Sequence, residues 1–402
     1  MKNCYSLCFF LLTCFLCYSQ SYKKVHQKAI LIDTHNDVLS SAVLNGKDIS
    51  HQITEGHSDL DRFKQGGVDV QFFSVFTGPD ARNKEARPDD PFGRGVYKDA
   101  NEEIDSLESI VRRNTDRMLL AMNYKQVKEG IRQEKLVALI GVEGGHMIED
   151  DMQKLEALYN RGMRYMTLTW NNSTNWVSSA MDETLNPEKL KHKGLTDFGK
   201  KVVKRMNELG IIVDLSHTGE QTFFDAIAIT TKPVLLSHSS VWNICPVFRN
   251  VKDDQIKAVA RNCGVICVNF YSGFISAAFD KQSEYLNGQG KKIIQDSLLA
   301  VTNDSTAMKT KWEEYYKKEL SKVRPTITQL VDHIDYIVKL VGDDYAGIGA
   351  DFDGVGSLPV GMDDVTAYPK ITEELLRRGY SKKSIKKILG GNVLRVMKAN
   401  FK

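Results

Sequence analysis

Residues 197–217 read DFGKKVVKRMNELGIIVDLSH and contain one full repeat of the pattern that decides the fold. Apolar side chains recur at helical spacing over residues 197–209, and Gly210 follows them as a helix-ending residue. A short β-branched run over residues 211–215 comes next and stops at Ser216 and His217. The stretch predicts a helix, then a buried strand, then polar side chains at the carboxyl end of that strand.

The same pattern recurs along the chain. Strands are predicted at residues 29–33, 68–75, 136–142, 165–169, 211–215, 233–236, 265–270 and 345–349. Helices are predicted at residues 151–161, 197–209, 254–262, 330–341, 371–378 and 381–397. Alternating strands and helices indicate a parallel sheet with both faces covered. Eight strands and no glycine-rich dinucleotide fingerprint favour an α/β fold of the (β/α)8 TIM-barrel type over an open doubly wound sheet.

Two stretches depart from the repeat. Residues 78–101 are rich in Pro, Arg, Asp and Gly, which predicts a long loop near the ends of the strands. Residues 280–325 are polar and charged, with a helix-like run at 308–320, and predict a helical insertion between the seventh and eighth strands. This insertion is either a lid over the site or a solvated decoration. Residues 20–402, with this insertion, are expected to form a single domain.

The first residues have the order of a secretory signal peptide. Lys2 precedes an apolar run that extends from Cys4 to Cys17, and the small residue Ser19 follows. Residues 1–19 are therefore predicted to be removed, leaving an exported protein that is periplasmic or secreted. A lipoprotein is the alternative, because Cys14 and Cys17 lie late in the run. No second long apolar run follows, so no transmembrane segment is expected in the mature chain.

The overall composition is ordinary for a folded protein. The chain is 42% hydrophobic and 26% charged with a formal net charge of +3, and it contains no block of like charge. Nucleic acid is therefore not an expected partner. Outside the predicted signal peptide the cysteines are Cys245, Cys263 and Cys267, an odd number that does not make a disulfide framework. They are predicted to be thiols of the core.

Side chains that bind metals follow five of the eight predicted strands. In a barrel the carboxyl ends of the strands meet on one face, where such enzymes carry their active sites. Any one of these residues alone also fits a capped loop or a buried, hydrogen-bonded histidine. Together they exceed the four ligands of one tetrahedral zinc ion, which predicts two metal ions that share a bridging carboxylate. In chain order they are Asp33, His35, Asp37, Glu143, His146, His217, His238, Asp351 and Asp353.

Several segments together carry a family resemblance. The motifs are LIDTHND at 31–37, GVEGGH at 141–146, DLSH at 214–217, LSHSS at 236–240 and GADFDG at 349–354. They closely resemble the renal or membrane dipeptidase family of the amidohydrolase superfamily. The resemblance extends over nearly the whole mature chain and includes residues 194–196, 249–251 and 392–395. It implies a zinc-dependent dipeptidase that acts on dipeptides or related small amides, and a homodimer.

The resemblance also implies two zinc ions per chain. His35 and Asp37 would bind one ion, His217 and His238 the other, and Glu143 would bridge them. Zinc lowers the pKa of bound water toward ~7, so that a hydroxide held between the ions could attack the scissile carbonyl at neutral pH.

Two further residues would complete the chemistry that the resemblance implies. Asp351 would accept the proton of the nucleophile and pass it to the departing amine. Arg249 would bind the C-terminal carboxylate with a two-pronged contact, which suits a substrate of two residues. The alternative for Arg249 is a structural ion pair with a carboxylate at a strand end. Asp33, His146 and Asp353 would orient the ligands.

One residue departs from the family pattern. The run YMTLTWNN at 165–172 places Trp170 where many relatives have a histidine that contacts the substrate. The indole can donate one hydrogen bond but cannot accept one or carry a proton. Trp170 therefore either assists by donation or, with Trp176, forms an apolar wall of the pocket.

Two other functions remain open. The departure at Trp170 allows a related hydrolase that acts on a lactam or an N-acyl amino acid. A protein of another class, an exported peptide-binding protein without catalysis, would be marked by a broken ligand set or a missing Asp351. The five predicted ligands and Asp351 are all present.

Overall fold

The computed structural model describes residues 22–78, 95–293, 297 and 305–402. The predicted signal peptide at residues 1–19 lies outside these residues, so it stays a prediction. The same holds for most of the predicted loop at 78–101, of which residues 79–94 are not described.

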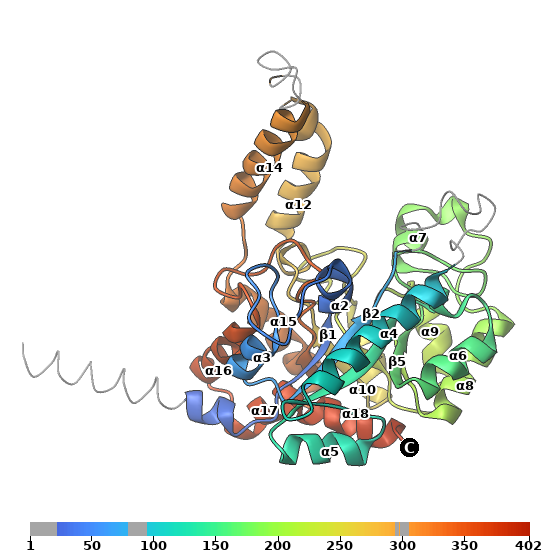
Figure 1. The fold of residues 1–402 in the computed structure, drawn as a ribbon. Coiled ribbons are helices and arrows are strands. Elements are labelled where there is room, and N and C mark those ends of the chain that lie inside the picture. Colours follow the sequence, from blue (N-terminus) through green and yellow to red (C-terminus); the bar gives the residue numbers. More distant parts are fainter. Residues whose placement is uncertain (1–21, 79–94, 294–296, 298–304) are drawn as a thin grey trace, which may run out of the picture.

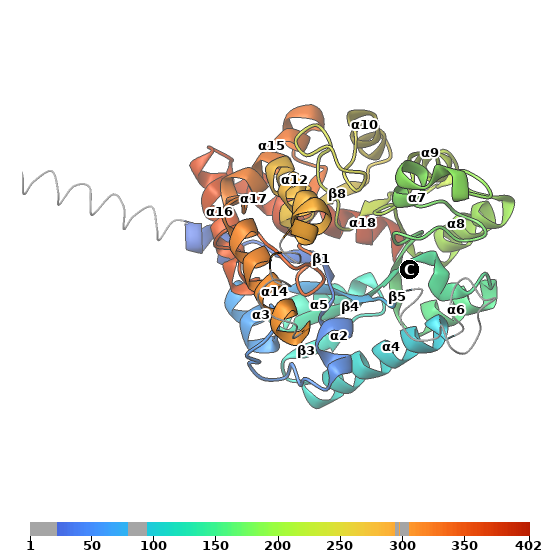
Figure 2. The same ribbon diagram turned by 90° about the horizontal axis from the view of Figure 1, so that it is seen from above.

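Eight parallel strands close into a barrel with helices around it (Figure 2). The ring closes because β2 pairs with β4 on one side and with β1 on the other, while β1 also pairs with β9. The predicted (β/α)8 barrel is confirmed. Its strands are β1 (Ile32–Asn36), β2 (Val70–Val75), β4 (Leu136–Glu143), β5 (Met163–Thr167), β6 (Ile212–Asp214), β7 (Leu235–Leu236), β8 (Val265–Val268) and β9 (Ala346–Ile348).

A ninth strand among the described residues lies outside the ring and was not predicted. β3 (Met118–Leu120) pairs with Leu136–Ala138 at the amino end of β4. β5 pairs with the same edge of β4 only from Ile140 onward. β3 therefore fills an edge that the ring leaves free, and three residues are too short for a periodic signal.

The first strand begins and ends later than predicted. β1 covers Ile32–Asn36 in place of residues 29–33, so His35 lies within the strand and not after it. All five residues of β1 are buried, although four of them, Asp33, Thr34, His35 and Asn36, are polar or charged. A run of polar residues usually indicates that a strand has ended. In this barrel the polar residues of β1 remain in the strand, because their side chains form hydrogen bonds in the interior. Glu143 likewise is the last residue of β4.

The helices mostly follow the predicted pattern. α8 covers residues 197–209 as predicted and ends at Gly210, whose φ of 88° is in the left-handed region that glycine favours. The described helices are α2 (Val38–Ser41), α3 (Leu60–Gly66), α4 (Val96–Arg113), α5 (Tyr124–Arg132), α6 (Met152–Asn160), α7 (Ala180–Leu185), α8 (Asp197–Leu209), α9 (Glu220–Ile229), α10 (Asp253–Arg261), α11 (Ser272–Ile275), α12 (Ala277–Tyr285), α14 (Ser305–Ser321), α15 (Ile327–Val341), α16 (Tyr368–Arg377), α17 (Lys382–Lys386) and α18 (Asn392–Asn400). In the described part of the chain, no helix has the length and apolar character needed to cross a membrane.

Two predictions about helices need correction. Residues 96–101 were assigned to a loop, but they form the first turns of α4. The predicted helix at 381–397 is divided by a π-helical segment, Lys387–Gly391. Gly390 lies in this segment, and a Cβ there would come 2.5 Å from the backbone oxygen of Ile30. The absence of a side chain at Gly390 thus allows the helix to approach the start of β1 closely.

The predicted insertion forms a pair of helices. α12 and α14 project together beyond the barrel (Figure 1), and their contact buries Phe279, Leu286 and Leu320. The insertion begins three residues earlier than predicted, at Ala277. Of the described residues of α12 and α14, none lines the cavity at the strand ends. This arrangement favours the interpretation of the insertion as a solvent-exposed extension over that of a lid.

The three cysteines outside the predicted signal peptide are free. Cys245 and Cys267 are buried, as expected of core thiols. Cys263 is exposed, which corrects the prediction for that residue. The reason is its place in the turn between α10 and β8, where its φ is 62°.

Candidate metal centre and substrate cavity

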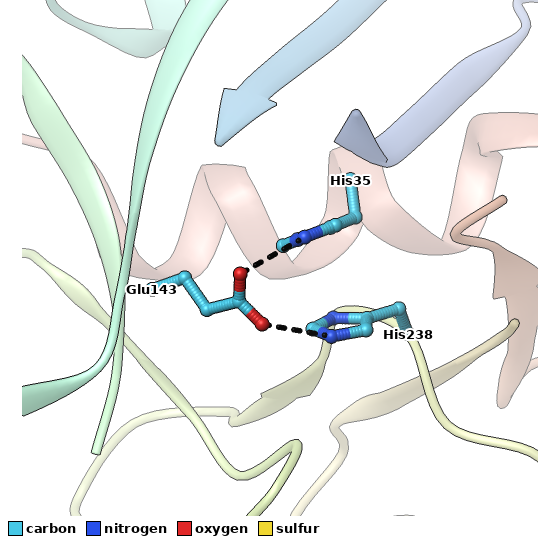
Figure 3. Close-up of side chains that lie close together, drawn as sticks. All are labelled: His35, Glu143 and His238. Atoms are coloured by element: carbon cyan, nitrogen blue, oxygen red, sulfur yellow. Dashed lines mark ion pairs between the residues drawn. The ribbon is translucent and has the colours of Figure 1, made fainter. Parts of the chain in front are cut away.

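The predicted metal ligands meet around Glu143. Oε1 of Glu143 lies 2.9 Å from Nε2 of His217 and 3.2 Å from Nε2 of His238. Oε2 lies 3.5 Å from Nε2 of His35, and that nitrogen lies 3.3 Å from Oδ2 of Asp37. Figure 3 shows the carboxylate of Glu143 beside the stacked imidazoles of His35 and His238, with one oxygen directed toward each ring. Each oxygen of Glu143 thus faces one of the two pairs that the sequence predicts.

The three histidines present the same nitrogen to the centre because a neighbour occupies the other one. Such a partner fixes the tautomer and the orientation of a ligating imidazole. Residues far away in the sequence supply two of the three partners, so sequence spacing did not reveal them. Nδ1 of His35 bonds to Tyr165 Oη at 2.9 Å, Nδ1 of His217 to Asn171 Oδ1 at 2.9 Å, and Nδ1 of His238 to Ser237 Oγ at 2.7 Å.

Asp33 holds the strand ends beneath the cluster. Its carboxylate accepts hydrogen bonds from the backbone N–H groups of His35 and Ala350 and from the hydroxyl of Tyr368. Burial raises the pKa of Asp33 to about 6, although these hydrogen bonds lower it. Asp33 therefore positions β1 against the loop after β9, in agreement with its predicted supporting place.

The other two supporting residues lie at the edge of the cluster. Nε2 of His146 bonds to the backbone oxygen of Thr77 at 2.9 Å. Oδ1 of Asp353 accepts a hydrogen bond from the backbone N–H of His57 at 2.6 Å. Both contacts join the strand-end loops to each other, and neither residue belongs to the groups of side chains that could hold an ion.

Backbone strain accompanies three of these residues. His217, Asp351 and Asp353 have φ values of 62°, 63° and 67°. Residues other than glycine rarely adopt this left-handed backbone conformation, which costs about 1–2 kcal/mol per residue. Such outliers gather at functional sites, where the surrounding structure holds them in place.

Burial and mutual contact determine the charges of the cluster. Burial lowers the pKa of His217 to about 3, so its imidazole is neutral. Burial also opposes ionisation of Glu143, but His35, His217 and His238 hold the pKa of its carboxyl well below the usual range. Burial lowers the pKa of His35, but Tyr165, Asp37 and Glu143 more than reverse this and raise it well above the usual value. The electrostatic field at the centre thus attracts positive charge.

The residues fit a metal site. Nε2 of His35 and Oδ1 of Asp37 are buried and have no hydrogen-bond partner in the described part of the chain, and such atoms are costly unless a ligand satisfies them. The ligand atoms of His35, Glu143 and His238 lie within 4.8 Å of one another, as do those of His35, Asp37 and Asp351. Neutral imidazoles and ionised carboxylates are the ligands that zinc prefers.

A cavity of about 460 Å³ opens beside this cluster. Its polar lining residues are Asp37, Glu143, His217, His238, Arg249 and Asp351. Its aromatic lining residues are Phe76, Trp170, Phe248, Tyr271 and Phe274. The cavity therefore combines polar groups for chemistry with an apolar surface for binding.

Trp170 and Trp176 occupy different places. Trp170 lines the cavity, with its ring centroid 4.9 Å from that of Phe76 and 6.3 Å from that of His217. Trp176 is buried against Phe198 and does not line this cavity, so the prediction for Trp176 was wrong. The turn at Gly145 lies against the Trp176 ring, where an added Cβ would come within 2.4 Å.

Arg249 has donors without partners beside the cluster. Its Nη2 donates to the backbone oxygen of His238 at 3.2 Å, and its guanidinium lies over the ring of Phe274 at 5.3 Å. Nε and Nη1 are buried and have no hydrogen-bond partner among the residues that the structure describes. Burial lowers the pKa of Arg249 to about 10, so the side chain is still a cation at neutral pH.

The described residues do not supply the structural ion pair that is the alternative for Arg249. Among the residues with described positions, no carboxylate lies within ion-pair distance of this guanidinium. Asp351, Glu143 and Asp214 act on it only through longer-range electrostatics. A buried cation without a counter-ion is costly, and a bound carboxylate would satisfy it.

Barrel and cluster together define a metal-dependent hydrolase with its centre at the carboxyl ends of the strands. The sequence profile of the membrane dipeptidase family (peptidase family M19) matches residues 19–401. The chain belongs to this family, and it is an enzyme of the metallo-dipeptidase class.

Solved structures share the fold at low sequence identity. The probable dipeptidase PvdM from Pseudomonas aeruginosa is 22% identical, with a TM-score of 0.77 over 95% of this chain and 98% of that one. A metallo peptidase from Rhodobacter sphaeroides, bound to a phosphinate mimic of the dipeptide L-Ala-D-Ala, is 21% identical, with a TM-score of 0.72 over 93% and 100%. An amidohydrolase from Pseudomonas aeruginosa is 20% identical, with a TM-score of 0.68 over 94% and 99%.

Proposed function

We propose that this chain is a zinc-dependent dipeptidase that binds the C-terminal carboxylate of its substrate through Arg249. The observation that carries the proposal is the Arg249 guanidinium, whose Nε and Nη1 have no hydrogen-bond partner among the described residues, in the same cavity as the Glu143 cluster. Membership of the membrane dipeptidase family supports the reaction class. The residues that line the cavity support the assignment of a dipeptide as the substrate and of Arg249 as the carboxylate-binding residue.

Five residues are proposed to hold the metal. His35 and Asp37 would bind one zinc ion, His217 and His238 a second, and Glu143 would contact both. When bound, zinc supplies Lewis-acid chemistry, because it lowers the pKa of water toward ~7 and polarises a carbonyl group. The protein itself contributes the neutral imidazoles of His217 and His238, with fixed tautomers, and the ionised carboxylate of Glu143.

Asp351 is the proposed acid–base residue. It lines the cavity, and its Oδ1 lies 3.9 Å from Nε2 of His35. Burial, with Asp37 and Glu143 nearby, raises the pKa of Asp351 well above its usual range. A carboxyl group with a raised pKa can take up the proton of the attacking water and deliver it to the leaving amine, which is otherwise expelled as a poor anion.

Arg249 is proposed to limit the length of the substrate. Its donors can pair with a carboxylate in two-pronged geometry. Because Arg249 is bonded to the backbone of His238, the carboxylate would lie close to the metal ligands. A substrate whose carboxylate is one residue beyond the scissile bond fits this spacing, and a longer peptide does not.

Trp170 keeps a second candidate open. It lines the cavity where relatives resembling this chain often have a histidine. The second candidate is a hydrolase of a lactam or an N-acyl amino acid. The Rhodobacter metallo peptidase binds a mimic of L-Ala-D-Ala, so dipeptides with a D-residue also belong in a test.

The test is hydrolysis of L,L- and L,D-dipeptides, a tripeptide, a C-terminally amidated dipeptide and an N-acyl amino acid, with zinc measured on the same preparation. We expect about two zinc ions per chain, cleavage of dipeptides, and loss of cleavage on amidation and in Asp351→Asn. Intact dipeptides together with a cleaved N-acyl amino acid would establish the second candidate. A metal-loaded protein that binds dipeptides and cleaves nothing would be a binding protein.

A further inference from the structure

Asn269 lies directly after β8 and contacts the side chain of Asp351. It is fully buried, and its Nδ2 donates a hydrogen bond to Oδ2 of Asp351 at 2.8 Å. Its Oδ1 accepts a hydrogen bond from the backbone N–H of Tyr271 at 2.6 Å. The second bond defines the orientation of the amide, because a flipped amide would place two donors against each other. The donor group of Asn269 therefore faces Asp351.

This contact distinguishes the two oxygens of Asp351. Oδ2 is held by Asn269, while Oδ1 lies 3.9 Å from Nε2 of His35, on the side of the metal ligands. The backbone of Asp351 has a φ of 63°, and its N–H donates to the backbone oxygen of His35 at 3.2 Å. The backbone and Asn269 together restrict rotation of the carboxylate about its bond to Cβ.

Asn269 has no direct access to a substrate. It does not belong to the described residues that line the 460 Å³ cavity, whereas its neighbour Tyr271 does. Within the described part of the chain, the Asp351 carboxyl forms hydrogen bonds with two side chains: Asn269 donates to its Oδ2, and Asp37 shares a hydrogen bond with it. Any effect of Asn269 on the reaction must therefore pass through Asp351 or through the packing of the loop.

We infer that Asn269 is a positioning residue for dipeptide hydrolysis, which keeps Oδ1 of Asp351 toward the reacting bond by holding Oδ2. The inference rests on the acid–base role proposed above for Asp351. Proton transfer requires the oxygen to be within hydrogen-bond reach of the proton that it takes. A carboxylate that is free to rotate meets this condition for a smaller fraction of the time.

The first test replaces the amide and keeps its size. We expect Asn269→Leu to lower kcat by about 10- to 100-fold, as a displacement of about 1 Å in a reacting group does. KM should change by less than about threefold, because a group that acts only in the transition state does not bind the ground state. Asn269→Asp keeps the shape but replaces the donor with an acceptor, and should lose at least as much kcat.

Asn392 provides a matched control. It is 2% exposed, and its Nδ2 donates to the backbone oxygens of Asp343 and Ala346 at 2.8 and 2.9 Å. Asn392→Leu thus also removes a buried amide, but one without contact to Asp351. It should lower the melting temperature while kcat stays normal. An equal loss of kcat in Asn392→Leu and Asn269→Leu would assign the effect to stability and overturn the inference.

A double-mutant cycle with Asp351→Asn separates positioning from packing. If Asn269 acts through Asp351, Asn269→Leu has no further effect on the residual rate of Asp351→Asn. Additive losses would overturn the inference, as would a normal kcat in Asn269→Leu alone. Full activity in Asp351→Asn would instead overturn the acid–base role itself, so the two failures are distinguishable. Zinc content should be equal in all variants, which excludes metal loss as the cause.

Discussion

Arg249 Nη2 donates a hydrogen bond to the backbone oxygen of His238 at 3.2 Å. This bond ties the proposed carboxylate-binding group to a strand end that carries a proposed metal ligand. The distance between the Arg249 guanidinium and the proposed metal ligand His238 is therefore set by the backbone and by this one hydrogen bond. A rigid spacing of this kind favours one substrate length.

Arg249→Met should weaken the use of free dipeptides. We expect kcat/KM to fall about 10- to 100-fold, because a hydrogen bond to a charged group contributes about 1.5–3 kcal/mol. The measurement is steady-state kinetics on a dipeptide and on its amidated form. The amidated form lacks the carboxylate, so the mutation should leave its slow cleavage nearly unchanged. Equal losses on both substrates would contradict a role in carboxylate binding.

Glu143→Gln should reduce metal binding. An amide oxygen is a weaker ligand than a carboxylate, and one face of the amide presents a donor to His217 or His35. We expect fewer than two zinc ions per chain after dialysis and a loss of activity, measured by elemental analysis. Glu149→Gln is the matched control, since Glu149 bonds instead to backbone N–H groups of Gly95 and Tyr97. Full zinc content in Glu143→Gln would exclude Glu143 as a shared ligand.

Trp170→Ala should act mainly on binding. Trp170 contributes to the aromatic lining of the cavity and packs near Phe76. Removing its ring should raise KM for dipeptides with an apolar first residue by about 5- to 30-fold, as expected for 1–2 kcal/mol of lost apolar contact, while kcat changes less. The measurement compares Phe- and Gly-containing dipeptides. A loss confined to kcat would indicate that the indole donates to the transition state.

Asp69 should make stability depend on pH. Its Oδ2 accepts a hydrogen bond from the backbone N–H of Leu31 at 2.8 Å, and burial raises the pKa of this carboxyl to about 6. Between pH ~4 and ~6 the native state binds more protons here than the unfolded state, so stability falls as pH rises through this window. Asp69→Asn should remove this part of the dependence and stabilise the protein at pH 7 by about 1–2 kcal/mol.

Denaturant unfolding at pH 4, 5, 6 and 7 measures the effect of Asp69→Asn. The difference between variant and wild type should grow with pH and level off above pH 6. Asp116→Asn, at an exposed carboxylate, is the control for the loss of one negative charge. A difference that shrinks with rising pH would show that the carboxylate is stabilised in the native state.

Much of the barrel could be predicted from local patterns. Runs such as residues 136–142 and 211–215 are nearly all apolar because both faces of a barrel strand are buried, and glycine after a helix marks its end. β3 and the π-helical segment that contains Gly390 could not be predicted. β3 is too short for a periodic signal, and the π-helical segment depends on how closely the helix approaches β1.

The sequence by itself determined the repeating strands and helices, and it placed imidazoles and carboxylates at the strand ends. Parallel strands in a barrel bring those ends together whatever the details of packing. Only the tertiary structure decided which residues support them. Tyr165 and His35 are 130 residues apart, and Asn269 and Asp351 are 82 apart. Tertiary structure also decided that Trp170 and not Trp176 lines the cavity. Such contacts depend on register and side-chain direction across the closed barrel, and no spacing along the chain encodes them.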